Sequence, residues 1–102
     1  MHFVFLYVTC THTLEARSLS RLLLQKNLIA CANIFPMESI YWWEGKIVSG
    51  KEAVLILKTS RNKVVRTRAE IEKMHSYKVP CITEIHVKPN AKYARWWAEQ
   101  LG

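Results

Sequence analysis

Hydrophobic and polar positions change their period several times along this chain, which predicts strands alternating with helices. Residues 2–10 alternate well enough for a strand, and both faces are apolar, as in a central strand covered on both sides. From Thr11-His12-Thr13 to Asn27 the apolar residues follow helical spacing. Glu15 stands in the first turn, where a carboxylate suits the helix dipole, and Asn27 is a plausible helix stop. These residues therefore predict a strand followed by a helix.

The next segments predict a strand, a long β-hairpin, a second helix and a fourth strand. Residues 30–35 have a strand pattern that Pro36 interrupts, and residues 40–59 are typical of a long hairpin with Ser49-Gly50 as its turn. The remaining predicted elements are a helix over residues 63–74 capped by Ser60 or Asn62, a strand over residues 81–87, and a short terminal helix capped by Asn90.

This order, βαββαβ plus a helix, predicts an α+β fold of the ferredoxin-like sandwich type. Its helices cover one face of an antiparallel sheet, and its second and third strands form the long hairpin. With 102 residues, the chain is expected to be a single domain over residues 1–102. The other face of the sheet is apolar too, and no segment is left that is large enough to cover it. Oligomerisation is therefore the main functional expectation from the pattern alone.

Composition narrows the class of protein without naming a function. A hydrophobic fraction of 50% argues against disorder, and no apolar run approaches the roughly 18 residues of a membrane span. Residues 2–8 lack a basic region and a small-residue cleavage site, so we expect a strand there rather than a signal peptide, and a cytoplasmic protein. Cys10, Cys31 and Cys81 are odd in number and far apart, which fits reduced thiols better than disulfides.

Charge permits several partners without establishing one. The net charge of +7 favours attraction to nucleic acid, anionic metabolites or anionic membranes, although a solubilising surface is the commoner explanation. The aromatic–glycine motif of RNA-binding ferredoxin-like domains is absent, so nucleic acid is not the expected partner. The chain has no aspartate to orient a histidine and no glycine-rich phosphate loop, so we expect no enzyme.

Three adjacent aromatic residues, Tyr41, Trp42 and Trp43, stand out within the predicted hairpin. Because successive side chains of a strand point to opposite faces, Trp42 and Trp43 cannot both enter one core. Either the segment is an aromatic strand in a small sheet, or one tryptophan contacts a partner subunit or a ligand.

Ordered motifs along nearly the whole chain give a resemblance to a known family. They are Ala30-Cys31-Ala32-Asn33-Ile34-x-Pro36, Ser39-Ile40-Tyr41-x-Trp43-Glu44-Gly45-Lys46, Leu57-Lys58-Thr59, His75-x-Tyr77-x-Val79-Pro80-x-Ile82 and Tyr93-x-x-Trp96. In these motifs the chain resembles the CutA family, the divalent-cation tolerance proteins.

The resemblance implies a tight homotrimer, similar in architecture to PII signalling proteins, in which the long hairpin reaches the neighbouring subunit. Tyr41, Trp42, Trp43 and Glu44 of the hairpin are then expected at the trimer interface. The resemblance also implies a link with tolerance of divalent cations, copper in particular, through metal binding or signalling rather than catalysis.

His75 is the first candidate metal ligand, and Cys81 is the second. An imidazole and a thiolate suit copper or zinc, but two ligands are too few for a tight site, so a subunit interface would have to supply more. Alternatively, His75 caps its helix end as a partial cation. Against the family pattern, Lys78 and Cys81 stand where glutamates are usual, and Val8 stands where a copper-linked cysteine sometimes occurs. His86 is separated from Cys81 by an odd number of positions, which predicts opposite faces of the strand.

The second hypothesis is a PII-like trimer that senses a small anionic ligand in clefts between subunits. Lys58, Arg61 and Lys78 are the cations expected to face such a ligand, and Tyr77 or Trp42 is expected to stack on it.

Overall fold

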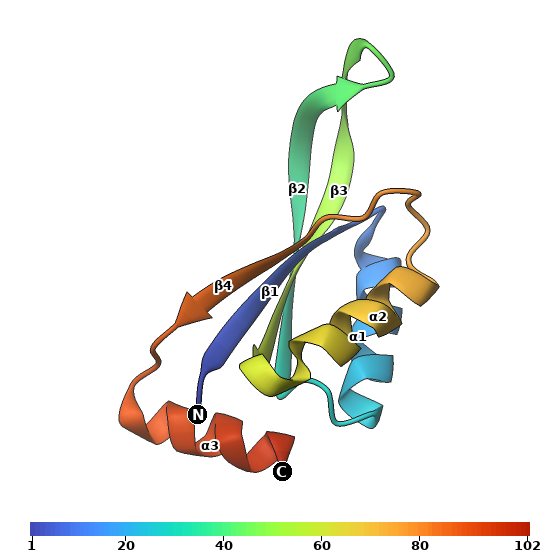
Figure 1. Cartoon of the computed structure of the whole chain (residues 1–102). Helices are drawn as coiled ribbons and strands as arrows, with labels where there is room; N and C mark the ends of the chain where they lie inside the picture. The colour runs from blue at the N-terminus through green and yellow to red at the C-terminus, as the bar shows by residue number, and fades with distance from the viewer.

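A four-stranded antiparallel sheet forms the centre of the molecule, in the strand order β2-β3-β1-β4. The computed structural model describes residues 1–102. The ferredoxin-like order predicted from the sequence is confirmed, including the long hairpin and the C-terminal helix (Figure 1). The elements are β1 (Phe3–Cys10), α1 (Thr13–Gln25), β2 (Cys31–Trp43), β3 (Lys46–Ser60), a 3-10 turn (Arg61–Lys63), α2 (Val64–Met74), β4 (Ile82–Val87) and α3 (Ala91–Leu101).

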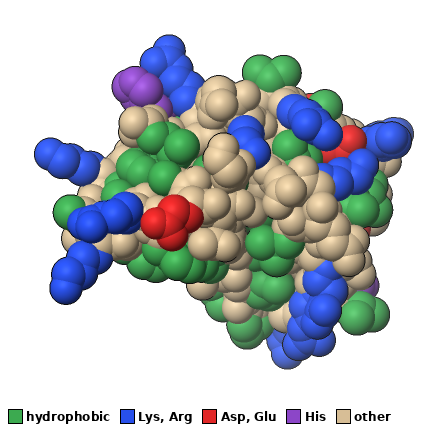
Figure 2. Space-filling model, turned by 90° about the horizontal axis from the view of Figure 1, so that it is seen from below, with side chains coloured by type: hydrophobic (Ala, Val, Ile, Leu, Met, Phe, Trp, Pro, Cys, Tyr) green, Lys and Arg blue, Asp and Glu red, His purple; other side chains and the backbone are tan.

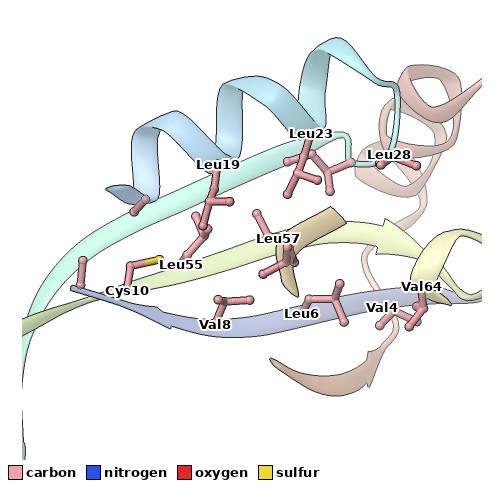
Figure 3. Packing of buried hydrophobic residues seen from close by; sticks show 14 residues of the cluster. Val4, Leu6, Val8, Cys10, Leu19, Leu23, Leu28, Leu55, Leu57 and Val64 are labelled. Atoms are coloured by element: carbon pink, nitrogen blue, oxygen red, sulfur yellow. The ribbon is translucent and has the colours of Figure 1, made fainter. Parts of the chain in front are cut away.

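The main core lies between the sheet and the helices α1 and α2. Alternate residues of β1 point toward the helices and are buried, which matches the alternation seen in the sequence. Figure 3 shows Leu19 and Leu23 of α1 facing Leu55 and Leu57 of β3. Each fully buried leucine stabilises the fold by about 1.5–3 kcal/mol relative to an exposed one. This cluster fixes the helices on one face of the sheet.

Helix α1 begins and ends where the sequence predicts. The imidazole Nδ1 of His12 accepts a hydrogen bond from the N–H of Glu15 at 3.1 Å and so caps the first turn. Asn27 has a φ of 56°, the left-handed conformation that commonly follows a helix end. No helix in the structure has both the length and the apolar content needed to cross a lipid bilayer.

The hairpin turn lies earlier than the sequence predicts. Its two turn residues are Glu44 and Gly45, with φ values of 49° and 77°, and Ser49-Gly50 is inside β3. A tight two-residue turn needs positive φ at both positions, and glycine adopts it without strain. The predicted interruption at Pro36 is also wrong, because β2 runs straight through it. Since β2 is an edge strand, half of its N–H groups have no partner strand, and a proline is tolerated there.

The second face of the sheet is covered at one end only. Trp97 of α3 is buried against Phe3 and Phe5 of β1, with ring centroids 4.8 Å and 5.9 Å apart. The expectation that nothing in the chain covers this face is therefore wrong at this end. Further along the same face, Phe35 and Ile85 remain 43% and 44% exposed. We call this uncovered remainder the open face.

Candidate functional site

The one group of side chains with metal-ligand chemistry lies where α2 ends beside the β1–α1 turn. The ligand atoms of Cys10, Glu15 and His75 all lie within 4.8 Å of one another. His75 follows the last residue of α2, Cys10 ends β1, and Glu15 is in the first turn of α1. The contact therefore joins segments that are far apart in the sequence.

Glu15 already holds two backbone groups with its carboxylate. Its Oε1 accepts from the N–H of Thr11 at 2.9 Å, and its Oε2 accepts from the N–H of Ser76 at 3.0 Å. The hydroxyls of Thr11 and Ser76 lie 2.9 Å apart and share a further hydrogen bond. Burial by itself raises the pKa of Glu15, but the bonds from Ser76 and Thr11 outweigh it and, with His75 nearby, hold the pKa below its usual value. The carboxylate thus ties the loop after α2 to the β1–α1 turn.

Replacing Glu15 with glutamine is expected to lower the free energy of unfolding by about 1 kcal/mol near neutral pH, since bonds to a charged, partly exposed acceptor are lost. Because the folded-state pKa is depressed, this stabilisation is fully present above the unfolded carboxyl pKa of about 4.3 and disappears as pH falls through the folded value. Urea unfolding of both proteins at several pH values measures it. Glu72→Gln, an exposed position on α2, is the control. A Glu15→Gln deficit that persists undiminished in acid would contradict the assignment.

His75 is held by hydrogen bonds at both ring nitrogens. Its Nε2 lies 2.7 Å from the carbonyl oxygen of Thr9, and its Nδ1 lies 3.0 Å from the N–H of Tyr77. A carbonyl only accepts, and an N–H only donates, so Nε2 carries the proton and Nδ1 accepts. Coordination of a metal by either nitrogen therefore requires one of these hydrogen bonds to break.

Cys10 is fully buried among the core residues, as the sequence predicts for a small apolar side chain. Burial, with Glu15 and Glu52 nearby, raises the pKa of its thiol to about 12. The thiol therefore carries its proton in the metal-free chain, and a metal would have to displace that proton to bind the sulfur. The hydrogen bonds of Glu15 and His75 join the loop after α2 to the β1–α1 turn, and a metal bound by these three residues would have to replace some of them.

Cys81 is exposed and lies outside this cluster. Its Sγ is 3.5 Å from the hydroxyl of Thr83, and its pairing with His75 stays a prediction. His86 has a different neighbour, with its Nε2 3.4 Å from a carboxylate oxygen of Glu84. Cys81 and His86 do not share a site.

A groove of about 780 Å³ opens where β2, β3 and the loop before β4 meet. The Tyr77 hydroxyl donates to the Glu52 carboxylate at 2.5 Å within it. Burial, and then this bond to Glu52, raise the pKa of Tyr77 above its usual value. The groove is lined by Tyr7, Thr9, Met37, Glu38, Ser39, Ile40, Tyr41, Trp43, Glu52, Ser76, Tyr77, Lys78, Val79 and Cys81.

The four residues predicted for an anion-binding cleft are not brought together within one chain. Tyr77 and Lys78 line the groove, but Lys58 donates to the hydroxyl of Tyr93 at 2.8 Å and lies 4.8 Å from that ring's centre. Burial opposes the charge of Lys58, yet the hydrogen bond to Tyr93 leaves its pKa raised. Arg61 lies beside a separate shallow hollow at the N-terminus.

The aromatic residues of the hairpin are exposed and divide between its two faces. Tyr41 and Trp43 line the groove, whereas Trp42 does not and is 71% exposed. Strand alternation thus separates Trp42 from Trp43, as the sequence predicts. Glu44 is in the turn at the tip.

Comparison with known proteins places the chain in a family. The family model described as "CutA1 divalent ion tolerance protein" matches residues 4–100. The chain belongs to the CutA1 family. It is similar to the divalent-cation tolerance protein CutA of Archaeoglobus fulgidus, with 41% identity over 96 residues and 94% of each chain covered. It is also similar to the protein of the same name from Thermococcus kodakarensis, with 41% identity over 102 residues, which cover 99% of this chain and 98% of the relative.

Solved structures of CutA1 proteins share the fold described above. The structure of the periplasmic divalent cation tolerance protein CutA from Archaeoglobus fulgidus has a TM-score of 0.95 at 39% identity, covering 98% of this chain and 99% of the other. The structure of CutA1 from Pyrococcus horikoshii has a TM-score of 0.91 at 36% identity, and the match covers 95% of this chain and 96% of the other. The family resemblance seen in the sequence motifs is confirmed.

Proposed function

We propose that this CutA1-family chain works as a homotrimer that binds a divalent cation, copper first among them, and acts by binding or signalling rather than catalysis. The observation that carries the proposal is the open face of the sheet. Only 22 of the 102 residues are buried in the single chain, so much apolar surface is left for partner subunits to cover. The exposed apolar residues of the open face and hairpin are Phe35, Ile40, Tyr41, Trp42, Trp43, Ile47 and Ile85.

The shape of the hairpin supports the same assembly. The molecule measures 45 × 25 × 21 Å, and the β2–β3 hairpin projects beyond the helices (Figure 1). Exposed aromatic side chains on both of its faces are costly in a monomer, because they would stay in contact with water. In the proposed trimer, Tyr41, Trp42, Trp43 and Glu44 contact a neighbouring subunit.

For the metal, we propose His75 as a ligand, with Cys81 as the second and further ligands supplied across the subunit interface. Cys81 is exposed and lines the groove, whereas the thiol of Cys10 is buried in the core and its pKa is raised. Binding at His75 would compete with the hydrogen bonds to Thr9 and Tyr77. An imidazole with a thiolate suits copper and zinc.

The test is a calorimetric titration with Cu(II) and, separately, with Zn(II). Zn(II) has no redox chemistry, so heat measured with zinc cannot come from oxidation of a thiol. We expect His75→Ala and Cys81→Ser to weaken binding about tenfold or more, and Cys10→Ser and His86→Ala to leave it unchanged. Circular dichroism confirms that each variant is folded. If His75→Ala binds like the unaltered protein, or the unaltered protein binds neither metal, the metal proposal is wrong.

A PII-like ligand sensor is the alternative function, and the groove supports it. A volume of about 780 Å³ is in the range of small-molecule sites. Nucleic-acid binding has less support, because Lys26 and Arg68 pair with Glu70 and Glu84. On the face that Figure 2 shows, lysines and arginines are spread around the edge rather than gathered in one patch. We propose the cytoplasm as the compartment, since all three cysteines are free thiols.

A further inference from the structure

We propose that His75 binds a metal ion through its Nδ1 atom, and that binding releases the loop residues 75–77 that follow α2. The basis is the proposed function, in which His75 is a metal ligand; the ligand atom and the structural change that follows are the new elements. Both come from the hydrogen bonds of the imidazole ring, and neither depends on the second ligand or on the trimer.

The two ring nitrogens of His75 have different partners, and only Nδ1 can accept a metal without losing a proton. Nε2 donates its proton to the carbonyl oxygen of Thr9 at 2.7 Å, whereas Nδ1 accepts the N–H of Tyr77 at 3.0 Å. A histidine that binds a metal almost always donates its other ring N–H to an oxygen acceptor, which orients the ring. The carbonyl of Thr9 is therefore the positioning group, and Nδ1 is the ligand atom.

Binding at Nδ1 displaces the backbone N–H of Tyr77, because one lone pair cannot serve both the N–H and a metal ion. Helix α2 ends at Met74, and His75 already has an extended backbone with φ −70° and ψ 140°. Residues 75–77 are thus held mainly by bonds to side chains rather than by regular secondary structure. The loss of one such bond frees part of the segment.

The neighbouring bonds decide how far the change extends. The N–H of Ser76 donates to the carboxylate of Glu15 at 3.0 Å, and this bond does not involve the ring of His75. The hydroxyl of Tyr77 donates to Glu52 of β3 at 2.5 Å, and its ring centre lies 4.8 Å from that of His75. We expect Ser76 to stay in place and Tyr77 to turn away. The bond between Tyr77 and Glu52 therefore opposes metal binding, and metal binding weakens that bond in return.

Imidazole nitrogen signals in magnetic resonance spectra test the ligand atom. Zn(II) is the probe, because it has no redox chemistry. Without zinc, we expect Nε2 of His75 to be protonated and Nδ1 to be unprotonated. With equimolar zinc, the Nδ1 signal should shift while Nε2 keeps its proton. His86, which lies beside Glu84, is the control, and neither of its ring nitrogens should shift.

Hydrogen exchange at single amides tests the release. Zinc should speed exchange of the Tyr77 N–H about fivefold or more, because its acceptor is lost. The Ser76 N–H is the internal control, since its bond to Glu15 remains and its exchange should not change.

Two matched variants test the coupling to β3. Tyr77→Phe removes the hydroxyl bonded to Glu52, so we expect it to bind zinc about fivefold more tightly than the unaltered protein. Tyr93→Phe removes a hydroxyl that is bonded to Lys58 instead, and it should leave the affinity for zinc unaltered.

The outcomes separate this inference from the proposed function. If zinc shifts Nε2 of His75 and removes its proton, or if the Tyr77 N–H stays protected, the inference is wrong while the metal proposal stands. If neither nitrogen of His75 responds to zinc, both are wrong. Tyr77→Phe binding zinc no more tightly than Tyr93→Phe also overturns the inference. Light scattering on the same samples reports the trimer independently.

Discussion

Replacing Phe35 with lysine is expected to convert the assembly into monomers. Phe35 lies on the open face of β2 and is 43% exposed in the single chain, so a partner subunit is expected to cover it. The substitution removes about 1.5–3 kcal/mol of apolar burial at each interface and places an unpaired ammonium there, which costs several kcal/mol more. Light scattering should give a mass near that of one 11.9 kDa chain.

The matched control is Val65→Lys on α2. Val65 is 75% exposed but lies on the helical side of the molecule, away from the open face. The same change of an apolar side chain to lysine should leave the mass of the assembly unaltered. If Phe35→Lys keeps the mass of the unaltered protein, or if Val65→Lys disrupts it equally, the open face is not the interface.

Trp97→Ala is expected to lower the free energy of unfolding by about 3–5 kcal/mol, the usual cost of deleting a large buried aromatic side chain. Trp97 is 1% exposed and packs against Phe3, Phe5 and Tyr93, so its loss opens a cavity under α3. Urea unfolding at one fixed protein concentration measures the change, because assembly makes stability depend on concentration.

Two further variants test the reason for that loss. Trp96 is 40% exposed, so Trp96→Ala should lower the free energy of unfolding by about 1 kcal/mol or less, close to the effect of a typical surface substitution. Trp97→Phe should cost much less than Trp97→Ala, because it keeps a ring and removes an indole N–H that is buried without an acceptor. If the Trp97→Ala protein is as stable as the Trp96→Ala protein, the packing of α3 on the second face of the sheet does not contribute to stability.

Local patterns in the sequence predicted most of the fold, and the register of the hairpin was the main error. The alternation of β1 and the stop at Asn27 depend on neighbouring residues, so sequence alone suffices for them. Ser49-Gly50 is a common turn sequence and therefore predicts the turn there. Its true position at Glu44-Gly45 depends on pairing 13 residues of β2 against β3, and a glutamate in the left-handed region gives little local indication.

The sequence predicts those residues of the candidate site that are marked by their local position in the chain, but not the neighbours that the fold brings to them. The place of His75 at a helix end marks it in the sequence. Nothing local links it to Cys10 and Glu15, which are its neighbours only because the folded chain brings the end of α2 to the β1–α1 turn. The one local indication was Glu15 itself, three residues after the helix cap, as in a capping box. Lys58 and Arg61 are close in sequence but have different surroundings, because Lys58 is within β3 and contacts Tyr93 whereas Arg61 begins the next turn beside the N-terminal hollow.

The mass of the unaltered protein in solution tests the central proposal most directly. Sedimentation or light scattering at micromolar concentration should give about three times the 11.9 kDa mass of the chain, because in the proposed trimer partner subunits cover the remainder of the open face. A stable mass near 11.9 kDa would contradict the trimer, and with it the intersubunit sites proposed for cations.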